Sequence, residues 1–502
     1  MILVFIFLPT IFLPRINLAE NLGLFKSIEF HRNSIVQVEM FYRKPTQCFA
    51  MSNEPDESKK RWAVIGGGML GLATAWRLMQ RGQSVTVFDA GSSVGGLTSA
   101  WRIGNVTWDR FYHVALLSDI YLRGLLKELD LERDIDWVQT RTGFYAGGKL
   151  HSLSSSLEFL RFPMLSFYEK FRLGGTIFFG SKLRDWKALE KIPVETWLRR
   201  WSGKSTFEKI WQPLLKCKLG DAYQRTNAAF IWAYIQRMYA ARRSGMKREM
   251  FGYVNGGYDT TLHAFATHLV GHGVELRTSA KVTKIAPLPA TIGWQIGYDN
   301  AEASLTDSFD RVVTTVPSPS ILETVDGLSE NEIRLLSRTE YLGVVCTSLL
   351  LSKPLGGYYV TNITDPGIPL TGVIEMGSIL KPEQLGGHYL VYLPKYVLAN
   401  DPAMDESPDT IHERCLTTLE RMYPHFKRTD VHAIQTAKAR YVMALPTLDY
   451  SGQRCPVVAE RPGLYLLNSA RIVDGTLNVN EILRLVDMEL PSSIWPAHTK
   501  CL

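Results

Sequence analysis

Three glycines between residues 64 and 72 constrain the fold of this chain more than any other feature. Gly66, Gly68 and Gly71 have the G-x-G-x-x-G spacing, and they separate a short apolar run from a stretch with helical periodicity. In a strand–turn–helix unit, such glycines allow a tight turn, a close approach to a pyrophosphate and close packing of the helix on the sheet. A second strand ends at Asp89, about 20 residues later, where a carboxylate can bind the ribose of an adenosine. The pattern therefore predicts a dinucleotide site, and the acid favours FAD or NAD over NADP.

A second glycine pair follows the strand that ends at Asp89. A backbone segment that crosses close to the pyrophosphate and the ribityl chain needs residues without a Cβ atom, and Gly95 and Gly96 supply them. This second crossing favours FAD over NAD. No cysteine sits in a setting that suggests covalent attachment, so we expect non-covalent FAD. The contacts expected in this region come from Gly66, Gly67, Gly68, Met69, Leu70, Gly71, Asp89, Ala90, Gly95, Gly96, Leu97 and Thr98.

Later segments carry further motifs in a fixed order. They are residues 108–113, a glycine pair before a helix at 255–258, and residues 280–285, 310–317 and 462–481. Their order resembles that of the flavin-containing amine oxidase and protoporphyrinogen oxidase superfamily, which includes phytoene desaturases and, more remotely, UDP-galactopyranose mutases. The resemblance implies an α/β protein, with a glutathione-reductase-type FAD-binding Rossmann domain and an inserted mixed α+β substrate domain. It also implies that FAD is contacted by Val282, Thr315, Ser469, Asn478 and Val479.

Three parts of the chain depart from the pattern of that superfamily. Leu97 stands where an arginine or lysine normally faces the pyrophosphate. Asn468 and Ser469 stand where a glycine and an acid usually bind the ribityl chain or the phosphate. Residues 478–480 offer no aromatic side chain of the kind that true amine oxidases present beside the flavin. The last departure argues against the oxidation of small amines.

Composition and periodicity divide the chain into segments. We expect the FAD-binding domain to be built from residues 58–150, 251–322 and 455–490. The substrate domain is expected from two insertions, the helical residues 151–250 and the strand-containing residues 323–454. Residues 1–50 form an extension. For it we favour a start at Met51 over an apolar anchor, because the apolar run is shorter than the roughly 20 residues that a membrane helix needs.

Charge and cysteine usage narrow the partners and the compartment. The net charge is +7, but the basic residues are scattered, so solvated faces explain the charge better than attraction to an anionic lipid or an anionic substrate. No nucleic-acid signature accompanies the charge, and nucleic acid is not an expected partner. The 6 cysteines are widely spaced, which fits a reducing compartment and no metal site. We expect a cytoplasmic protein, with peripheral contact at the inner face of a membrane as the alternative.

Candidate catalytic side chains follow from the resemblance. In flavin enzymes the cofactor accepts the electrons, so the protein mainly orients the substrate. The resemblance assigns four side chains to the surroundings of the isoalloxazine ring or the substrate cavity: Tyr253, Glu375, Lys395 and Tyr396. Glu375 is the best candidate for a general base, because it follows an apolar strand. A structural role is the alternative for each of them.

These patterns together predict an FAD-dependent oxidoreductase. We expect it to remove a hydride from a C–N or C–C bond of a mostly apolar small molecule, bulky or polyprenyl-like, and to pass the electrons to an acceptor. The first alternative is a flavin enzyme without net redox change, such as a sugar-nucleotide mutase or an isomerase. The second is a nucleotide-binding protein without flavin redox activity, which the departures at Leu97 and Asn468 keep open.

Overall fold

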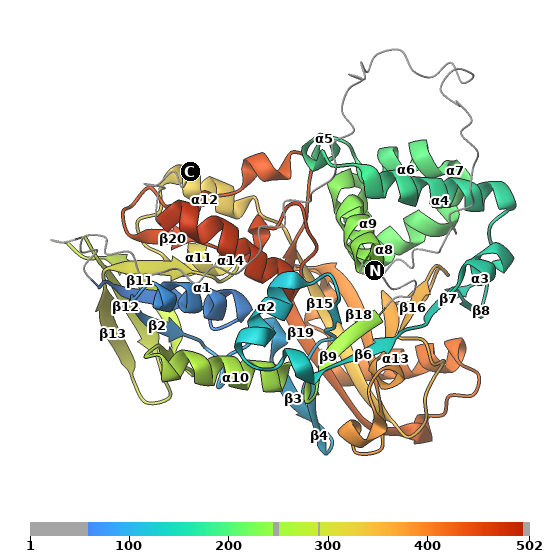
Figure 1. The fold of residues 1–502 in the computed structure, drawn as a ribbon, viewed down its shortest axis with the longest axis horizontal. Coiled ribbons are helices and arrows are strands. Elements are labelled where there is room, and N and C mark those ends of the chain that lie inside the picture. Colours follow the sequence, from blue (N-terminus) through green and yellow to red (C-terminus); the bar gives the residue numbers. More distant parts are fainter. Residues whose placement is uncertain (1–58, 244–249, 290–291, 495–502) are drawn as a thin grey trace, which may run out of the picture. The chain divides into compact units, whose positions relative to one another are not determined.

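A five-stranded parallel sheet forms around the strand that precedes the glycine turn (Figure 1). The structure is a computed structural model that describes residues 59–243, 250–289 and 292–494. The extension predicted for residues 1–50 and the start at Met51 lie outside the described residues. In sheet order the strands are β10 (Glu275–Arg277), β2 (Ser84–Phe88), β1 (Arg61–Ile65), β14 (Arg311–Thr314) and β20 (Leu464–Leu466). Segments far apart in the chain therefore share this sheet.

Helices cover one face of the parallel sheet. Side chains of β1 and β2 such as Trp62, Val64 and Val87 pack there into one hydrophobic core. The apolar sides of the helices complete this core, which is why amphipathic sequences fold onto this face. The helices that contribute to it are α1 (Met69–Gln80), α2 (Ile120–Glu128), α10 (Gly257–Gly271) and α14 (Val479–Ile494).

The other face of the parallel sheet packs against a small antiparallel sheet and two helices. Ala63, Ile65 and Phe88 point to this side, where they join Ile296 and Phe309 in a separate core. The alternation follows from strand geometry, which sends neighbouring side chains to opposite faces. The elements on this side are β11 (Lys281–Pro287), β12 (Trp294–Asp299), β13 (Ser304–Phe309), α11 (Ser318–Thr324) and α12 (Glu330–Ser337).

A seven-stranded sheet forms the second large layer. Its order is β19 (Val431–Ala444), β15 (Tyr341–Leu351), β18 (Tyr389–Leu398), β17 (Gly372–Glu375), β16 (Val360–Ile363), β7 (Thr142–Ala146) and β8 (Lys149–Ser152). One face packs against α13 (Pro408–Met422). The opposite face packs against α8 (Gln212–Leu219) and α9 (Ala228–Arg243), and we call it the helical face of the sheet.

A run of helices lies between β8 and β9. The helical character that the sequence indicates for this stretch is confirmed in its described residues. Before α8 and α9 the helices are α3 (Ser156–Arg161), α4 (Phe167–Lys182), α5 (Trp186–Glu190), α6 (Val194–Ser202) and α7 (Lys204–Thr206). Figure 1 shows this group in shades from teal to green, and α4 contacts both α6 and α9.

Two short antiparallel sheets connect the layers. One is the hairpin of β3 (Ala100–Ile103) and β4 (Val106–Asp109), and the other joins β5 (Ala115–Leu116), β9 (Met250–Val254) and β6 (Ile135–Gln139). The described chain therefore has the mixed α/β class that the sequence predicts. The domain boundaries and the division into a Rossmann domain and an inserted domain stay predictions.

Candidate functional site

The turn between β1 and α1 requires glycine at two positions. Gly66 has φ of +105°, a backbone conformation that disfavours other residues, and its N–H donates to the Phe88 carbonyl at 2.8 Å. A Cβ atom at Gly71 would lie 1.8 Å from the Gly66 carbonyl oxygen. These glycines therefore serve the fold of the turn itself.

At Gly68, neither the backbone conformation nor the packing of the fold requires glycine. The residue precedes α1 with φ of −71° and ψ of 175°, which any residue can adopt. A Cβ atom there would meet no protein atom closer than 3.9 Å. The missing side chain therefore leaves open space at the N-terminus of α1, where free N–H groups and the helix dipole favour an anion. A pyrophosphate fits this cradle.

The second glycine pair crosses close to the first turn, as the sequence predicts. The Gly95 N–H donates to the Gly67 carbonyl at 2.8 Å, and Gly95 forms an isolated β-bridge with Gly68. A Cβ atom at Gly96 would lie 3.2 Å from the Gly68 Cα. Leu97 and Thr98 complete the short helix η1 (Gly96–Thr98) that follows. The two crossings therefore border the same space above α1.

Asp89 is tied to the turn by both carboxylate oxygens. Its Oδ2 accepts from the Gly67 N–H at 2.7 Å and its Oδ1 accepts from the Gly91 N–H at 2.7 Å. Each oxygen retains a further lone pair, so the half-buried carboxylate is positioned to bind ribose hydroxyls as well. Ala90, next along the chain, is exposed.

The remaining predicted cofactor residues have local structural partners. The Thr315 hydroxyl donates to the Ile65 and Gly66 carbonyls at 2.9 and 3.1 Å, so it braces the glycine turn. Asn478 Oδ1 accepts from the Glu481 N–H at 3.1 Å and caps α14, in which Val479 is the first residue. Ser469 begins the short helix η10 (Ser469–Arg471). Val282 packs beside the core on the β11 side of the parallel sheet.

The four candidate catalytic residues do not lie together. Strand side chains alternate between faces, so Tyr396 contacts the core on the helical face of the seven-stranded sheet, whereas Lys395 points to the other. Lys395 there acts electrostatically on Cys415 of α13. Glu375 is in register with Val391, which belongs to the core on the α13 side. The structure therefore separates Tyr396 from Lys395 and Glu375.

The Glu375 carboxylate binds the backbone of the loop that contains Gly356 and Gly357, before β16. Its carboxylate oxygens accept from the N–H groups of Gly356 and Gly357 at 3.0 to 3.1 Å, and the residue is 2% exposed. Burial raises the pKa of Glu375, although these hydrogen bonds oppose the shift. This environment gives the carboxylate a structural role, and it faces away from the side where Tyr396 lies.

The helical face of the sheet carries a cluster of tyrosines and a buried lysine. The hydroxyls of Tyr112 and Tyr396 lie 3.1 Å apart. Lys218 of α8 places its Nζ 2.9 Å from the centroid of the Tyr396 ring. Burial alone lowers the pKa of Lys218, while burial raises the pKa of Tyr396 to about 12. Among the described residues, Lys218 has this aromatic ring in place of an ion-pair partner.

Sequence reasoning did not single out Lys218. The signal that could have found it is its position on the apolar side of a helix. Leu214 and Leu215 precede it by about one turn, Leu219 follows, and all three are buried. A lysine in such a row is uncommon, because an unpaired buried charge is unfavourable.

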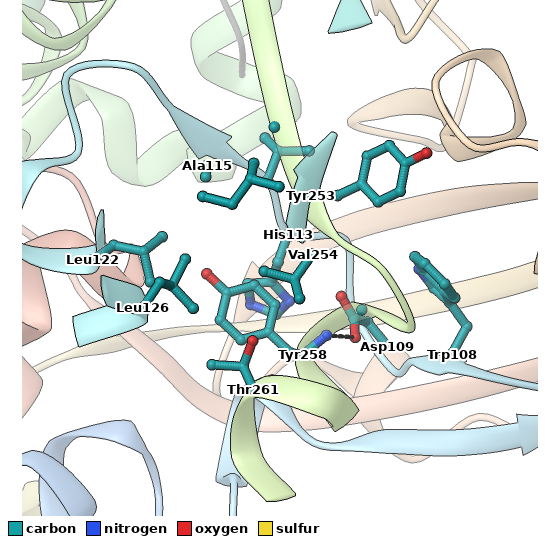
Figure 2. Close-up of a pocket in the computed structure, with 14 residues that line it drawn as sticks. Trp108, Asp109, His113, Ala115, Leu122, Leu126, Tyr253, Val254, Tyr258 and Thr261 are labelled. Atoms are coloured by element: carbon teal, nitrogen blue, oxygen red, sulfur yellow. Dashed lines mark hydrogen bonds between the residues drawn. The ribbon is translucent and has the colours of Figure 1, made fainter. Parts of the chain in front are cut away.

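A small cavity lies between the β4 end, α2 and α10 (Figure 2). Its volume is about 20 Å³, which is room for about one water molecule. Figure 2 shows the Asp109 carboxylate near the Tyr258 backbone, whose N–H donates to Asp109 Oδ1 at 2.8 Å. The ring of His113 packs edge-on against that of Tyr258, with centroids 5.2 Å apart. The cavity is therefore lined mainly by apolar side chains, with Asp109 and His113 among the polar exceptions.

Burial shifts the proton affinities of Asp109 and His113 in this cavity. It raises the pKa of Asp109 to about 8, against the Tyr258 hydrogen bond, which lowers it. It lowers the pKa of His113 to about 4, so the imidazole is neutral near pH 7. The Asp109 carbonyl also accepts from the Tyr392 hydroxyl at 2.5 Å, which links the cavity to the helical face of the sheet.

Tyr253 lines the cavity with its ring and turns its hydroxyl away. That hydroxyl donates to Asp136 Oδ2 at 3.2 Å, and burial raises the pKa of Tyr253 to about 12. Figure 2 shows the hydroxyl pointing away from Asp109. Tyr253 is therefore near this cavity, and Tyr396 is at the tyrosine cluster.

Comparison with known proteins identifies the family. Residues 70–476 match the family described as flavin containing amine oxidoreductase. The chain belongs to this family. The resemblance stated from the sequence is confirmed, and membership of this family implies a flavin cofactor.

Individual relatives are distant. Protoporphyrinogen oxidase 2, chloroplastic/mitochondrial, of Arabidopsis thaliana is 27% identical over 165 residues, which are 32% of this chain and 32% of that protein. This chain thus spans about a third of the length of that relative. Zeta-carotene desaturase of Synechocystis sp. is 22% identical over 334 residues, which are 61% of this chain and 67% of that protein.

Solved structures share the fold over nearly their whole length. An oxidoreductase from Methanosarcina mazei has a TM-score of 0.65 at 18% identity, and covers 85% of this chain and 99% of its own. The CLA-producing fatty acid isomerase from P. acnes has a TM-score of 0.62 at 14% identity, with coverage of 87% and 99%. At such identities the likeness shows the fold alone.

Two features are absent from the described residues. Across residues 59–243, 250–289 and 292–494, no group of three or more His, Cys, Asp or Glu side chains is arranged to hold a metal ion. In the same part of the chain no helix has the length and apolar character needed to cross a membrane.

Proposed function

We propose that the protein binds FAD non-covalently and uses it to remove a hydride from a C–N or C–C bond of a mostly apolar organic substrate. The observation that carries this is the open space at the N-terminus of α1. Gly68 leaves this space free of protein atoms, and Gly96 borders it. The parallel sheet around β1 supports the interpretation as a glutathione-reductase-type Rossmann domain.

The proposed division of labour follows from flavin chemistry. Bound FAD supplies the hydride acceptor, and the chain supplies orientation and a dry surround. The helical face of the seven-stranded sheet suits the second task, because Tyr112, Tyr392 and Tyr396 present large ring surfaces there.

An apolar substrate is supported by two observations. Asn478, Val479 and Asn480 provide no aromatic residue for a small-amine cage. One relative is a zeta-carotene desaturase, whose name indicates a polyene substrate. We infer a bulky or polyprenyl-like substrate and a cytoplasmic protein, with peripheral contact at the inner face of a membrane as the alternative.

A second candidate function has one specific observation in its favour. The fold likeness extends to a fatty acid isomerase over 87% of this chain. An isomerase or a sugar-nucleotide mutase would use the same flavin site without net oxidation. We rank it second because the fold alone supports it.

Anaerobic mixing of the purified protein with candidate substrates tests the proposal. Amines, tetrapyrroles, polyenes and nucleotide sugars would each be added, and bleaching of the visible flavin absorbance would be recorded. We expect bleaching with an apolar substrate and little with benzylamine-sized amines. If only the pre-reduced enzyme turned over, and the product were rearranged but not oxidised, the second candidate function, an isomerase or mutase, would be correct. Protein that carries no flavin would favour a nucleotide-binding role.

A further inference from the structure

The outward face of α4 is aromatic. Phe167, Tyr168 and Phe171 are 77%, 67% and 65% exposed, and Phe178 and Phe179 are 49% and 52% exposed. With 3.6 residues per turn, these five positions fall on one side of the helix. A helix at the surface of a globular protein normally turns charged or polar residues outward. The solvent side of α4 is therefore the apolar one.

The inward face of α4 packs closely against neighbouring helices. It carries small residues that let neighbouring helices approach closely. A Cβ atom at Gly180 would lie 3.0 Å from the Ile235 side chain of α9, and the hydroxyl of Thr176 lies 3.0 Å from that of Ser202 of α6. At Gly180 the inner side therefore has no room for a larger side chain.

The exposed apolar area continues onto the neighbouring helices. Trp201 of α6 is 37% exposed, and its ring lies 5.5 Å from that of Phe179. Leu157 and Leu160 of α3 are 55% and 48% exposed. We call these side chains, with the five aromatic residues of α4, the α3–α4 apolar surface. Exposed apolar side chains gathered in this way on neighbouring helices mark an interaction site.

Exposed basic side chains outnumber exposed acidic ones in the segment that carries this surface. Between residues 156 and 204, the exposed acidic side chain is Asp185 alone, whereas the exposed basic ones are Arg161, Lys182, Arg184, Lys187, Lys191, Arg200 and Lys204. Lys182 places its Nζ 5.4 Å from the centre of the Phe178 ring. Aromatic rings with cations at their edges match the boundary between headgroups and acyl chains.

We propose that the α3–α4 apolar surface docks on a lipid bilayer that contains anionic phospholipid, with α4 lying in the headgroup plane. The excess of cations decides between a bilayer and a second copy of the chain. Two copies facing each other would bring like charges together, whereas anionic lipid neutralises them. The docking does not depend on the chemistry performed at the flavin.

Vesicle sedimentation of the full chain tests the docking. The protein would be mixed with vesicles of phosphatidylcholine, with or without phosphatidylglycerol. We expect binding to the mixed vesicles that weakens with added salt. The double variant Phe171→Gln with Phe178→Gln should lower the partition coefficient about tenfold or more, because each ring leaves the apolar phase. Lys182→Gln with Arg184→Gln should weaken binding to the mixed vesicles only.

A matched control uses exposed apolar residues elsewhere. Val270 of α10 and Ile333 of α12 are 55% and 44% exposed, so Val270→Gln with Ile333→Gln changes a similar amount of surface. This variant should bind vesicles like the unchanged protein. Flavin content and melting temperature report that each variant is folded.

Three results would overturn the docking. The first is a protein that sediments with neither kind of vesicle. The second is a dimer that the double variant of Phe171 and Phe178 abolishes while vesicles bind neither form. The third is binding that disappears on deletion of residues 2–50 but persists in that double variant, because the N-terminal segment would then be the anchor.

Discussion

Replacement of Gly68 by alanine separates the binding of the cofactor from the stability of the fold. The new Cβ atom would meet no protein atom closer than 3.9 Å, and the backbone angles suit alanine. The free energy of unfolding of the apoprotein should therefore change by less than about 1 kcal/mol. The same Cβ atom enters the space proposed for the pyrophosphate. Overpacking of this kind costs about 1–3 kcal/mol, so the Kd for FAD should rise roughly 5- to 150-fold.

Replacement of Gly71 by alanine is the matched control. Its Cβ atom would lie 1.8 Å from the Gly66 carbonyl oxygen, so the turn has to move. We expect a loss of about 3 kcal/mol or more in the free energy of unfolding, whether or not FAD is present. The two variants carry the same substitution three residues apart. Gly68→Ala should weaken FAD binding, whereas Gly71→Ala should lower the free energy of unfolding.

Two measurements on the apoproteins distinguish these outcomes. Urea denaturation gives the free energy of unfolding, and quenching of flavin fluorescence during titration gives the Kd for FAD. A Gly68→Ala variant that binds FAD like the unchanged protein would refute the placement of the pyrophosphate. A strongly destabilised Gly68→Ala apoprotein would refute the claim that the fold has no need of this glycine.

Further predictions address the polar groups of the two layers. Asp89→Ala should weaken FAD binding by about 1.5–3 kcal/mol, the contribution of a charged hydrogen bond, as measured by the same titration. Lys218→Met should raise the free energy of unfolding by about 1–3 kcal/mol, because it removes a buried unpaired amine. The folded pKa of Lys218 is lowered, so the unchanged protein loses stability as pH falls from about 10 through that folded pKa. Denaturant titrations should show the loss in the unchanged protein and its absence in the variant. For Asp109 the pH dependence of stability has the opposite sign, because its pKa is raised to about 8. Its contribution to stability is complete below pH 3.8 and is lost as pH rises through about 8. Asp109→Asn should flatten this decline in a series of thermal melts. Glu375→Gln should cost about 1–3 kcal/mol of stability with little change in turnover per bound flavin, since its carboxylate accepts backbone N–H groups. A rate loss above about tenfold at unchanged stability would restore the role of general base.

The glycine turn could be predicted from the sequence because its requirements are local. The φ of Gly66 and the close approach of Gly71 to it are fixed within a few residues, so the motif carries the geometry with it. The second crossing at Gly95 was predictable for the same reason, although its contact with Gly67 adds a long-range element.

The candidate catalytic residues could not be placed in the same way. Lys395 and Tyr396 are adjacent, yet they point to opposite faces of the seven-stranded sheet, and the sequence alone does not say which face carries α8. The cavity residues Asp109 and Tyr258 meet across 149 positions of chain. Such contacts depend on how layers pack, and no local pattern records them.

The exposed aromatic residues of α4 show a related limit. Aromatic residues in an amphipathic stretch are ordinarily assigned to a core. That interpretation holds for Trp197, Trp211 and Trp232, which are buried, but Trp201 is 37% exposed. Which side of a helix faces inward depends on its neighbours, and here small residues such as Gly180 occupy that side.

The parallel sheet has a consequence for how the protein is made. β1 lies between β2 and β14, and β14 pairs in turn with β20. Trp62 is in register with Arg311, and Val312 is in register with Leu464, so each pairing needs a segment that is synthesised much later. A ribosome must therefore synthesise most of the chain before the sheet that carries the glycine turn is complete. Until then β1 has an unpaired edge, which is prone to wrong pairing. Cofactor loading is therefore expected late in synthesis, and folding slow, because its contacts join distant segments.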